Sequence, residues 1–266
     1  WRNLDVQDCN HQHSGGYLGG RYLSSKWDGM FAEYFKVPDV DLNVAKIPDG
    51  VSLEAAALVG DMVTTGFHGV ELADVKFGDR VCVIGIGPVG LMSVVGCVLR
   101  GAAEIYAVGH RPVTRELAMQ YGATATIDYQ DGPIVEQVMK LTGGQQIEKV
   151  IIAGGEPTVF NDALALVKYT GTVANLAGHG RTELLLPIYT NESGFGFCAH
   201  KTVTGGLCPG GRRRIERLMG MVKAGRFEPE KLITHRFYGL DGIEEAFDLM
   251  KSKNPEVIKP IIYFDK

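Results

Sequence analysis

The sequence lacks several features that would define a class of protein at once. None of its 5 cysteines (Cys9, Cys82, Cys97, Cys198 and Cys208) stands in a Cys-x-x-Cys pair. Neither a disulfide framework nor a four-cysteine zinc lobe is therefore indicated, and a reducing cytoplasm fits best. There is no long basic run, and the net charge is −4, which argues against nucleic acid as the main partner. No apolar stretch of membrane-spanning length is free of charge and glycine, and no signal peptide opens the chain.

The chain has 266 residues, of which 45% are hydrophobic, so it is long enough for one large core or two modest domains. Its 35 glycines are spread through the chain as loop and turn punctuation, without a repeat or a low-complexity segment. The chain begins with Trp1 rather than Met, and no first-strand pattern follows. We read this as a chain that lacks its own start, although processing would give the same result.

A Gly-rich motif follows a continuous apolar run. Residues 81–86, Val-Cys-Val-Ile-Gly-Ile, predict a strand buried on both faces of a parallel sheet. Gly85, Gly87 and Gly90 then give G-x-G-x-x-G, and a helical pattern comes next. In a dinucleotide-binding turn the first glycine permits the tight turn, the second lets a pyrophosphate approach, and the third lets the helix pack closely. The helix N-terminus offers free N–H groups to the phosphates.

The motif alone is weak evidence for a nucleotide site, so the pattern of strands and helices around it must show whether the turn binds a cofactor. Strand and helix patterns alternate downstream of the motif. Strands are predicted at 104–108, 123–129, 148–155 and 171–178, and helices at 111–122, 132–144 and 157–168. This alternation predicts an α/β fold with a doubly wound parallel sheet. It favours a cofactor-binding turn over a purely structural glycine turn.

The residues after the second predicted strand indicate which dinucleotide binds. An NAD site has an Asp or Glu there, which holds the ribose 2′-hydroxyl, but this sequence reads Val-Gly109-His110-Arg111. Gly109 leaves room for a 2′-phosphate, Arg111 can pair with it as a planar fork, and His110 adds a donor. The alternative is that Arg111 is an ordinary solvated residue, but in a first helical turn its charge opposes the helix dipole. The pattern therefore favours NADP(H).

With these residues in view, the chain resembles the zinc-dependent medium-chain alcohol dehydrogenases, and within them the microbial NADP-dependent secondary alcohol dehydrogenases. The motifs that carry the resemblance are HQHSGG, DMVTTGFHGVELAD, GIGPVGLM, YGATATIDY, VMKLTGG, AHKTVTGGLCPGGR, KLITH and IEEAFDLMK. The resemblance implies a Rossmann cofactor domain inserted in a GroES-like, β-rich catalytic domain that is incomplete here. Residues 1–64 and 206–266 would belong to the catalytic domain and residues 65–205 to the cofactor domain.

The resemblance also implies a catalytic zinc, which binds the alcohol oxygen as a Lewis acid while the nicotinamide accepts hydride. Of the four zinc ligands in the family, only the Asp has a counterpart, Asp61 in DMVTTGF. The Cys, His and Glu ligands and the Ser–His proton relay lie in a part of the family's catalytic domain that this sequence lacks. From the residues alone, a metal and a helix cap explain Asp61 equally well. His11, His13 and His68 show no metal-binding spacing and are interpreted as loop or packing residues.

The remaining site residues are implied by the resemblance alone. Thr65, a catalytic residue, would orient the nicotinamide, and Leu207 and Cys208 would wall the substrate pocket. Tyr129 and Lys253 would contact the cofactor, although strand-edge packing and a surface position explain them nearly as well. The other cofactor-binding residues would be Gly85, Ile86, Gly87, Pro88, Val89 and Gly90 at the pyrophosphate, Gly109, His110 and Arg111 at the 2′-phosphate, and Leu176, Ala177 and Gly178 after the fifth strand.

The sequence therefore predicts reversible, NADP-dependent oxidation of small secondary alcohols to ketones with zinc. The cysteine usage favours a cytoplasmic protein, and the resemblance adds a homo-oligomer, a tetramer in relatives. Neither a nucleic acid nor a membrane is expected as a partner. Two alternatives stay open. One is a zinc-free NADPH-dependent enone or quinone reductase of the same superfamily, against which Asp61 argues. The other is a catalytically incomplete NADP-binding fragment, which the missing zinc ligands favour.

Overall fold

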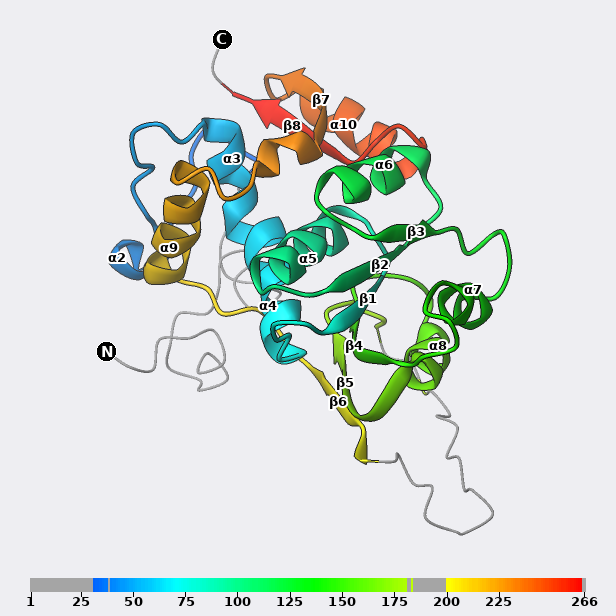
Figure 1. Cartoon of the computed structure of the whole chain (residues 1–266). Helices are drawn as coiled ribbons and strands as arrows, with labels where there is room; N and C mark the ends of the chain where they lie inside the picture. Colours follow the sequence, from blue (N-terminus) through cyan, green and yellow to red (C-terminus); the bar gives the residue numbers. More distant parts are fainter. Residues whose placement is uncertain (1–30, 38, 181–182, 184–199, 265–266) are drawn as a thin grey trace. The chain divides into compact units, whose positions relative to one another are not determined.

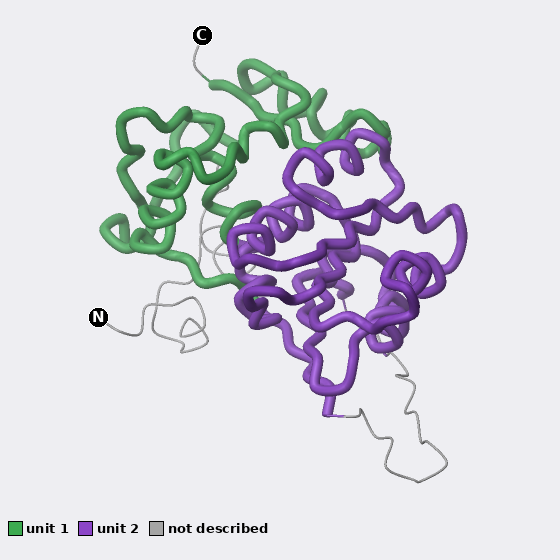
Figure 2. The backbone as a smooth tube through the Cα atoms, in the orientation of Figure 1, with its two compact units in different colours: residues 1–64, 207–266 green, residues 65–206 purple. Residues whose placement is uncertain are grey.

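The computed structural model describes residues 31–37, 39–180, 183 and 200–264 (Figure 1). The chain divides into two compact units (Figure 2). Unit 1 comprises Trp1–Thr64 and Leu207–Lys266, and unit 2 is Thr65–Gly206. Unit 2 is thus inserted in the sequence between the two parts of unit 1, and each unit is described by itself.

Unit 2 contains a six-stranded sheet in which every neighbouring pair of strands is parallel. Its strands are β1 (Arg80–Ile84), β2 (Glu104–Val108), β3 (Ala125–Ile127), β4 (Ile147–Ile152), β5 (Val167–Asn175) and β6 (Thr202–Gly205). Their order across the sheet is β3-β2-β1-β4-β5-β6, the order of the doubly wound dinucleotide-binding fold. The predicted Rossmann fold is confirmed.

Helices cover both faces of this sheet (Figure 1). They are α4 (Thr64–Leu72), α5 (Pro88–Leu99), α6 (Pro112–Gln120), α7 (Ile134–Leu141) and α8 (Val159–Leu166). α5 packs with α6 over β1 and β2, and α7 packs with α8 against β3, β4 and β5 on the opposite face. Because both faces are covered, the central strands must be apolar on both sides. Val81, Cys82, Val83 and Ile84 are accordingly all buried.

Several predicted boundaries differ from the structure by a few residues, and the third and fifth strands show why. The third strand, predicted over 123–129, is shorter and spans Ala125–Ile127. The side chain of Asp128 accepts the N–H of Gln130 at 2.9 Å and turns the chain away from the sheet, so Tyr129 lies after the strand. The fifth strand begins at Val167, before the predicted position, because Val167 already pairs with Ile147 across a register shift. Because Val167 pairs with a strand, α8 ends at Leu166, two residues before the end that the helical pattern predicted.

Unit 1 has fewer described residues in helices and strands than unit 2. Its described elements are α2 (Val40–Asn43), α3 (Leu53–Leu58), η2 (Val59–Val63), α9 (Arg212–Lys223), η4 (Pro229–Leu232), β7 (Ile233–Tyr238), α10 (Gly242–Lys251) and β8 (Lys259–Tyr263). β7 and β8 form a parallel pair. Ser52 caps α3 by accepting the N–H of Ala55 at 3.1 Å, a typical N-cap contact. Glu54 on α3 accepts two hydrogen bonds from Arg236 on β7, at 2.7 and 2.9 Å, which tie the two parts of this unit together.

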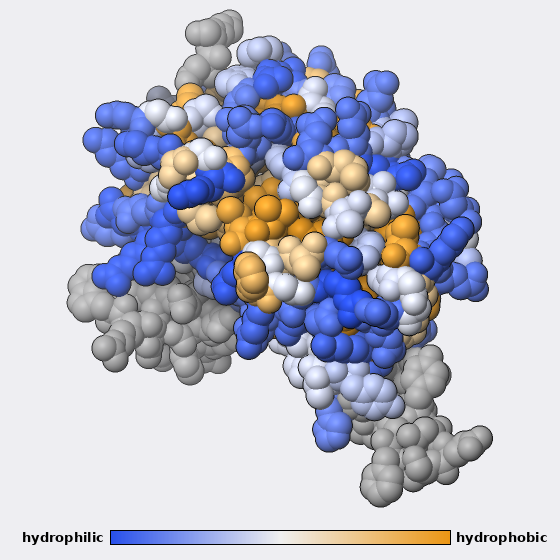
Figure 3. Space-filling view, viewed as in Figure 1, coloured by the Kyte–Doolittle hydropathy of each residue, from blue (hydrophilic) through white to orange (hydrophobic). Residues whose placement is uncertain are grey.

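Hydrophilic side chains cover most of the face of the molecule that Figure 3 shows. Over the stretches that the structure describes, no helix is both long and apolar enough to cross a membrane.

Candidate functional site

The glycine turn between β1 and α5 is the first part of the site. Gly85 has φ of 91°, and a Cβ atom there would lie 2.6 Å from the backbone nitrogen of Gly154, at the end of β4. A Cβ atom on Gly90 would lie 2.0 Å from the carbonyl oxygen of Gly85. A Cβ atom on Gly87 would meet nothing within 4 Å. The outer glycines thus permit close packing, and the middle one keeps a space open beside the helix.

The N-terminus of α5 borders this open space. Gly87 is the N-cap, Pro88 stands in the first turn, and no side chain of the described residues caps the helix. The first turn carries no acidic residue. The first N–H groups of a helix have no partner within the helix and carry the positive end of its dipole. The turn can therefore accept an anionic group of the pyrophosphate type.

Gly109, at the end of β2, has a packing role that the sequence did not indicate. A Cβ atom there would lie 2.3 Å from Cγ1 of Ile86, which is itself buried. The N–H of Gly109 donates to the carbonyl of Ile127 at 2.9 Å and joins the ends of β2 and β3. Gly109 was predicted to leave room for a phosphate, and its lack of a Cβ atom also makes room for the side chain of Ile86.

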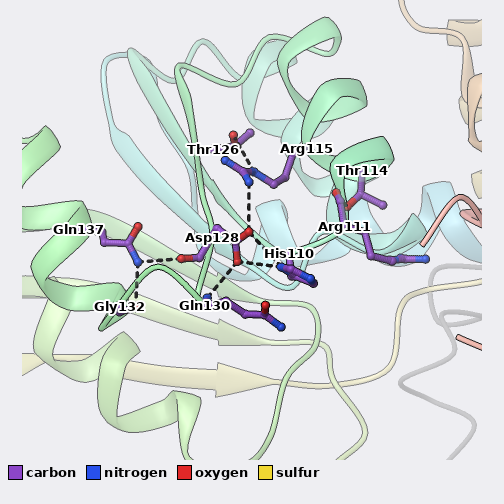
Figure 4. A network of polar contacts seen from close by, with 9 residues as sticks. All are labelled: His110, Arg111, Thr114, Arg115, Thr126, Asp128, Gln130, Gly132 and Gln137. Atoms are coloured by element: carbon purple, nitrogen blue, oxygen red, sulfur yellow. Dashed lines mark hydrogen bonds and ion pairs between the residues drawn. The ribbon is translucent and has the colours of Figure 1, made fainter. Parts of the chain in front are cut away.

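A carboxylate from the neighbouring strand holds His110 (Figure 4). Nδ1 of His110 lies 3.0 Å from Oδ2 and 3.1 Å from Oδ1 of Asp128. Asp128 also accepts a hydrogen bond from Nη1 of Arg115 at 3.2 Å and the N–H of Gln130. The loop that follows is fixed by Gln137, whose amide donates at 2.8 Å to the carbonyl of Asp128.

The environment keeps Asp128 ionised. Burial alone would raise the pKa of this carboxyl group, but hydrogen bonds from the Gln130 N–H and His110, with the charge of Arg115, outweigh it and lower the pKa below its ordinary value. Its side chain is only 9% exposed. A buried carboxylate of this kind is stable because it is paired and hydrogen-bonded.

Asp128 is the residue that the sequence analysis missed. The sequence has no carboxylate at the end of β2, and Tyr129 was the residue near the end of β3 that was predicted to contact the cofactor. The signal was present, because Asp128 is the last residue but one of the quoted motif YGATATIDY, and the carboxyl ends of adjacent parallel strands meet at one edge of the sheet. Asp128 lies 18 positions after His110, and this distance along the chain hides their proximity in the structure.

Arg111 lies beside this cluster as the N-cap of α6, and Pro112 follows in the first turn. The carbonyl of Arg111 accepts a hydrogen bond from the hydroxyl of Thr114 at 2.9 Å. Burial lowers the pKa of the guanidinium, and the nearby Tyr129 partly offsets this effect. Arginine remains charged at neutral pH despite such a shift. A half-buried cation therefore stands at the end of β2, where the sequence predicted a 2′-phosphate contact.

Other predicted cofactor residues lie along the same edge of the sheet. The ring of Tyr129 is 5.8 Å from that of His110, centre to centre, and 53% of the residue is exposed. Leu176, Ala177 and Gly178 directly follow β5. The side chain of Asn175 closes this turn, since its amide donates to the carbonyl of Ala177 and its Oδ1 accepts the N–H of Ala177.

Asp61, the predicted zinc ligand, lies in unit 1. It is the third residue of the π-helix η2 and not an N-cap, and it is exposed even though its sequence neighbours are apolar. The cap alternative is therefore wrong. Single π-helical turns are rare in proteins, and those that do occur are often found at functional sites.

Thr64, three residues beyond Asp61, anchors the segment 207–214. Its hydroxyl donates to the carbonyl of Pro209 at 3.1 Å and accepts a hydrogen bond from Nε of Arg214 at 2.7 Å. Within unit 1, Thr64 of the DMVTTG motif is thus joined to the residues that follow Leu207 and Cys208. Leu207 is 60% exposed, and Cys208 is half-buried. The predicted Thr65 follows directly and is half-buried.

No complete metal site is found in the part of the chain that the structure describes. No group of three or more His, Cys, Asp or Glu side chains there is arranged to hold a metal ion. His68 is buried on α4, with Nδ1 3.4 Å from Oε2 of Glu71. Burial raises the pKa of the Cys82 and Cys97 thiols, which disfavours the thiolate that binds metals. His11 and His13 lie outside the described residues.

Lys253 follows α10 in unit 1, with φ of 54° and an exposed side chain. It belongs to a different unit from the glycine turn, so its predicted cofactor contact stays a prediction.

Comparison with known proteins identifies dehydrogenases as relatives of this chain. Residues 88–223 match the family model described as zinc-binding dehydrogenase. The chain is 52% identical to the NADP-dependent isopropanol dehydrogenase of Thermoanaerobacter brockii, over 98% of this chain and 74% of the relative. It is 46% identical to the enzyme of the same name from Entamoeba histolytica, over 98% of this chain and 71% of the relative.

Solved structures show the same similarity. Alcohol dehydrogenase TADH from Thermus sp. ATN1 matches with a TM-score of 0.76 and 27% identity, over 89% of this chain and 66% of that one. Zinc dependent alcohol dehydrogenase 2 from Streptococcus pneumonia matches with a TM-score of 0.77 and 29% identity, over 90% and 66%. The chain therefore spans about three quarters of the length of the first relative and about two thirds of these two structures.

Proposed function

Because the chain belongs to the zinc-binding dehydrogenase family, we propose that it is an NADP-dependent oxidoreductase that interconverts small secondary alcohols and ketones. The relatives named NADP-dependent isopropanol dehydrogenases support this proposal at 52% and 46% identity. The observation that carries it is the combined arrangement at the sheet edge. An open glycine turn lies at the N-terminus of α5, and a cation, Arg111, stands at the end of β2 in place of a carboxylate.

The residues present fit NADP. Gly87 leaves space where a pyrophosphate needs it, and the uncapped N-terminus of α5 supplies N–H groups. Ile86, Pro88 and Val89 shape this turn. Arg111 supplies the positive charge that a 2′-phosphate requires. When bound, NADP⁺ supplies the hydride acceptor, and the role of the chain is to hold and orient it.

Thr65 is proposed to orient the nicotinamide ring, and Leu207 and Cys208 to contact the alcohol. With NADP⁺ bound, the nicotinamide would accept the hydride of the carbinol carbon and the hydroxyl proton would pass to water, so that the products would be a ketone and NADPH.

The residues described here do not fit zinc by themselves. Asp61 is the single member of the predicted ligand set that they contain, and they include no cluster of three possible ligands. A zinc-assisted step does not follow from these residues. Zinc enters the proposal through the family, with Asp61 as the ligand that this chain contributes.

The test combines three measurements on the full chain: NADPH and NADH affinity by nicotinamide fluorescence, oxidation of 2-propanol with NADP⁺, and zinc content. NADPH preference, alcohol oxidation and about one zinc per chain would establish the proposal. NADPH binding without alcohol oxidation and without zinc would leave the NADP-binding fragment. Reduction of an enone or quinone by the same zinc-free protein would establish the reductase instead.

The proposal also includes the cellular location and the self-association of the protein. We place the protein in the cytoplasm, which the buried Cys82 and Cys97, neither of which forms a disulfide, support. Self-association is proposed as well, as a tetramer by resemblance, and size-exclusion chromatography with light scattering tests it.

A further inference from the structure

The contact between His110 and Asp128 leads beyond the proposed function. Asp128 is buried and holds Nδ1 of His110 with both carboxylate oxygens, at 3.0 and 3.1 Å. The imidazole is half-buried, with 41% of its side chain exposed. Among the described residues, Nε2 has no hydrogen-bond partner. One side of the ring is therefore fixed to the protein, and the other nitrogen remains available to a ligand.

The position of this pair connects it with the cofactor. His110 follows β2 and Asp128 follows β3, at the carboxyl edge where doubly wound sheets bind their ligands. Arg111, the predicted partner of the 2′-phosphate, is the next residue after His110. A doubly protonated imidazole donates from both nitrogens, so one ring can bridge a carboxylate and a phosphate.

We propose that Asp128 is a positioning residue for the adenosine 2′-phosphate: it fixes His110 through Nδ1, so that Nε2–H donates to that phosphate. This inference rests on the proposed NADP-dependent function. Asp128 itself does not touch the phosphate and acts through the ring.

The charges around the ring are consistent with binding an anion. The carboxylate of Asp128 would repel a phosphate if it were unpaired, but Arg115 pairs with it at 3.2 Å. Arg111 then adds a second positive charge beside the ring, and Tyr129 is the other titratable neighbour. With Asp128, Arg115 and Arg111 ionised, the cluster carries a net positive charge before His110 is counted.

The chemistry of the ring also allows the opposite role, in which His110 favours NAD over NADP. The experiment distinguishes the two roles by the direction in which the cofactor preference changes. A neutral ring with the proton on Nδ1 would present Nε2 as an acceptor, which suits the 2′-hydroxyl of NAD. In that case Asp128 would support NADH binding. The two roles predict opposite changes in cofactor preference when the carboxylate is removed.

The experiment measures the ratio of the NADH and NADPH dissociation constants by fluorescence titration. The proteins are the wild-type chain, His110→Ala, Asp128→Asn and the double variant. We expect each single variant to lose about tenfold in NADPH preference, the effect of one charged hydrogen bond. The double variant should lose no more than His110→Ala alone. Asp131→Asn is the matched control, because it removes a carboxylate from the same turn at an exposed position, and it should keep the wild-type ratio.

An unchanged or increased NADPH preference in Asp128→Asn overturns the proposal. A further loss in the double variant also overturns it, since the carboxylate would then act on the fold and not through the ring. If the wild-type chain binds neither cofactor or prefers NADH, the proposed function has failed instead.

A second measurement needs no variant of Asp128. The side-chain ¹⁵N resonances of His110, assigned by their loss in His110→Ala, report on each ring nitrogen. We expect Nε2 to shift on addition of NADP⁺ and to remain in place with NAD⁺. Equal shifts with the two cofactors would contradict the contact even if Asp128→Asn did not fold.

Discussion

A Cβ atom on Gly90 would lie 2.0 Å from the carbonyl oxygen of Gly85, so the start of α5 is pressed directly against the end of β1. Gly87, between them, faces open space. The three glycines of one motif therefore have separable roles. Substitution of the outer ones affects packing, and substitution of the middle one affects the cofactor.

Gly90→Ala is expected to destabilise unit 2. The added methyl group must displace the backbone of Gly85, and overpacking of this kind costs about 1–3 kcal/mol. Urea unfolding followed by circular dichroism measures the loss. Gly220→Ala on α9 is the matched control, because a Cβ atom there meets nothing within 4 Å. That control should gain about 0.5–1 kcal/mol from its higher helix propensity. Wild-type stability in Gly90→Ala would contradict the packing role.

Gly87→Ala should give the opposite pattern. Its φ of −72° suits alanine and nothing obstructs the methyl group, so the unfolding midpoint should stay at the wild-type value. The methyl group would occupy the space proposed for the pyrophosphate. NADPH affinity should then fall by about tenfold or more, as when a charged hydrogen bond is lost. Unchanged affinity in titration would place the pyrophosphate elsewhere.

Arg111→Gln should remove most of the preference for NADPH over NADH. The guanidinium is the proposed partner of the 2′-phosphate, and loss of a charge-assisted pair weakens binding by about tenfold or more. NADH affinity should change little, because NADH has no phosphate at that position. Arg100→Gln, at the C-cap of α5, is a control for the loss of one positive charge. Equal weakening of both cofactors would argue for a structural role.

Glu148 should make stability depend on acid pH. Burial raises the pKa of this carboxyl group, but hydrogen bonds from Arg80, at 3.1 Å, and Lys168, at 2.9 Å, outweigh burial and hold the pKa at about 2. A depressed pKa in the folded state contributes stability that is complete above the ordinary value of 4.5 and is lost as the pH falls toward about 2.

Glu148→Gln should therefore be less stable than the wild type at neutral pH and should approach it as the pH falls through that range. Chemical unfolding at several pH values measures the difference. Glu156→Gln, at an exposed position, should run parallel to the wild type. A constant difference between Glu148→Gln and the wild type at every pH would exclude this ion pair as the cause.

Metal removal is expected to leave cofactor binding intact. The glycine turn and Arg111 lie in unit 2, whereas Asp61 lies in unit 1. Treatment of the full chain with a chelator should keep the dissociation constant of NADPH, measured by fluorescence, while any alcohol oxidation is lost. A chelator that abolished NADPH binding as well would show that the metal supports the fold of unit 2.

Much of the fold was predictable because it depends on local patterns. The run Val81–Ile84 is apolar on both faces, which only a covered parallel strand requires. The boundaries of β3 and β5 were less accurate. The contact of Val167 with Ile147 and the turn made by Asp128 involve partners that the local pattern does not contain.

The candidate site divides in the same way. The sequence by itself determined the strand, glycine turn and helix, and the cation Arg111 in place of a carboxylate, since these depend on spacing within one βαβ unit. Only the tertiary structure decided that Asp128 holds His110, that Gly109 packs on Ile86, and that Asp61 stands exposed in a π-helical turn. These contacts depend on which strands become neighbours and how a helix is wound, and neither is encoded by the spacing of the residues concerned.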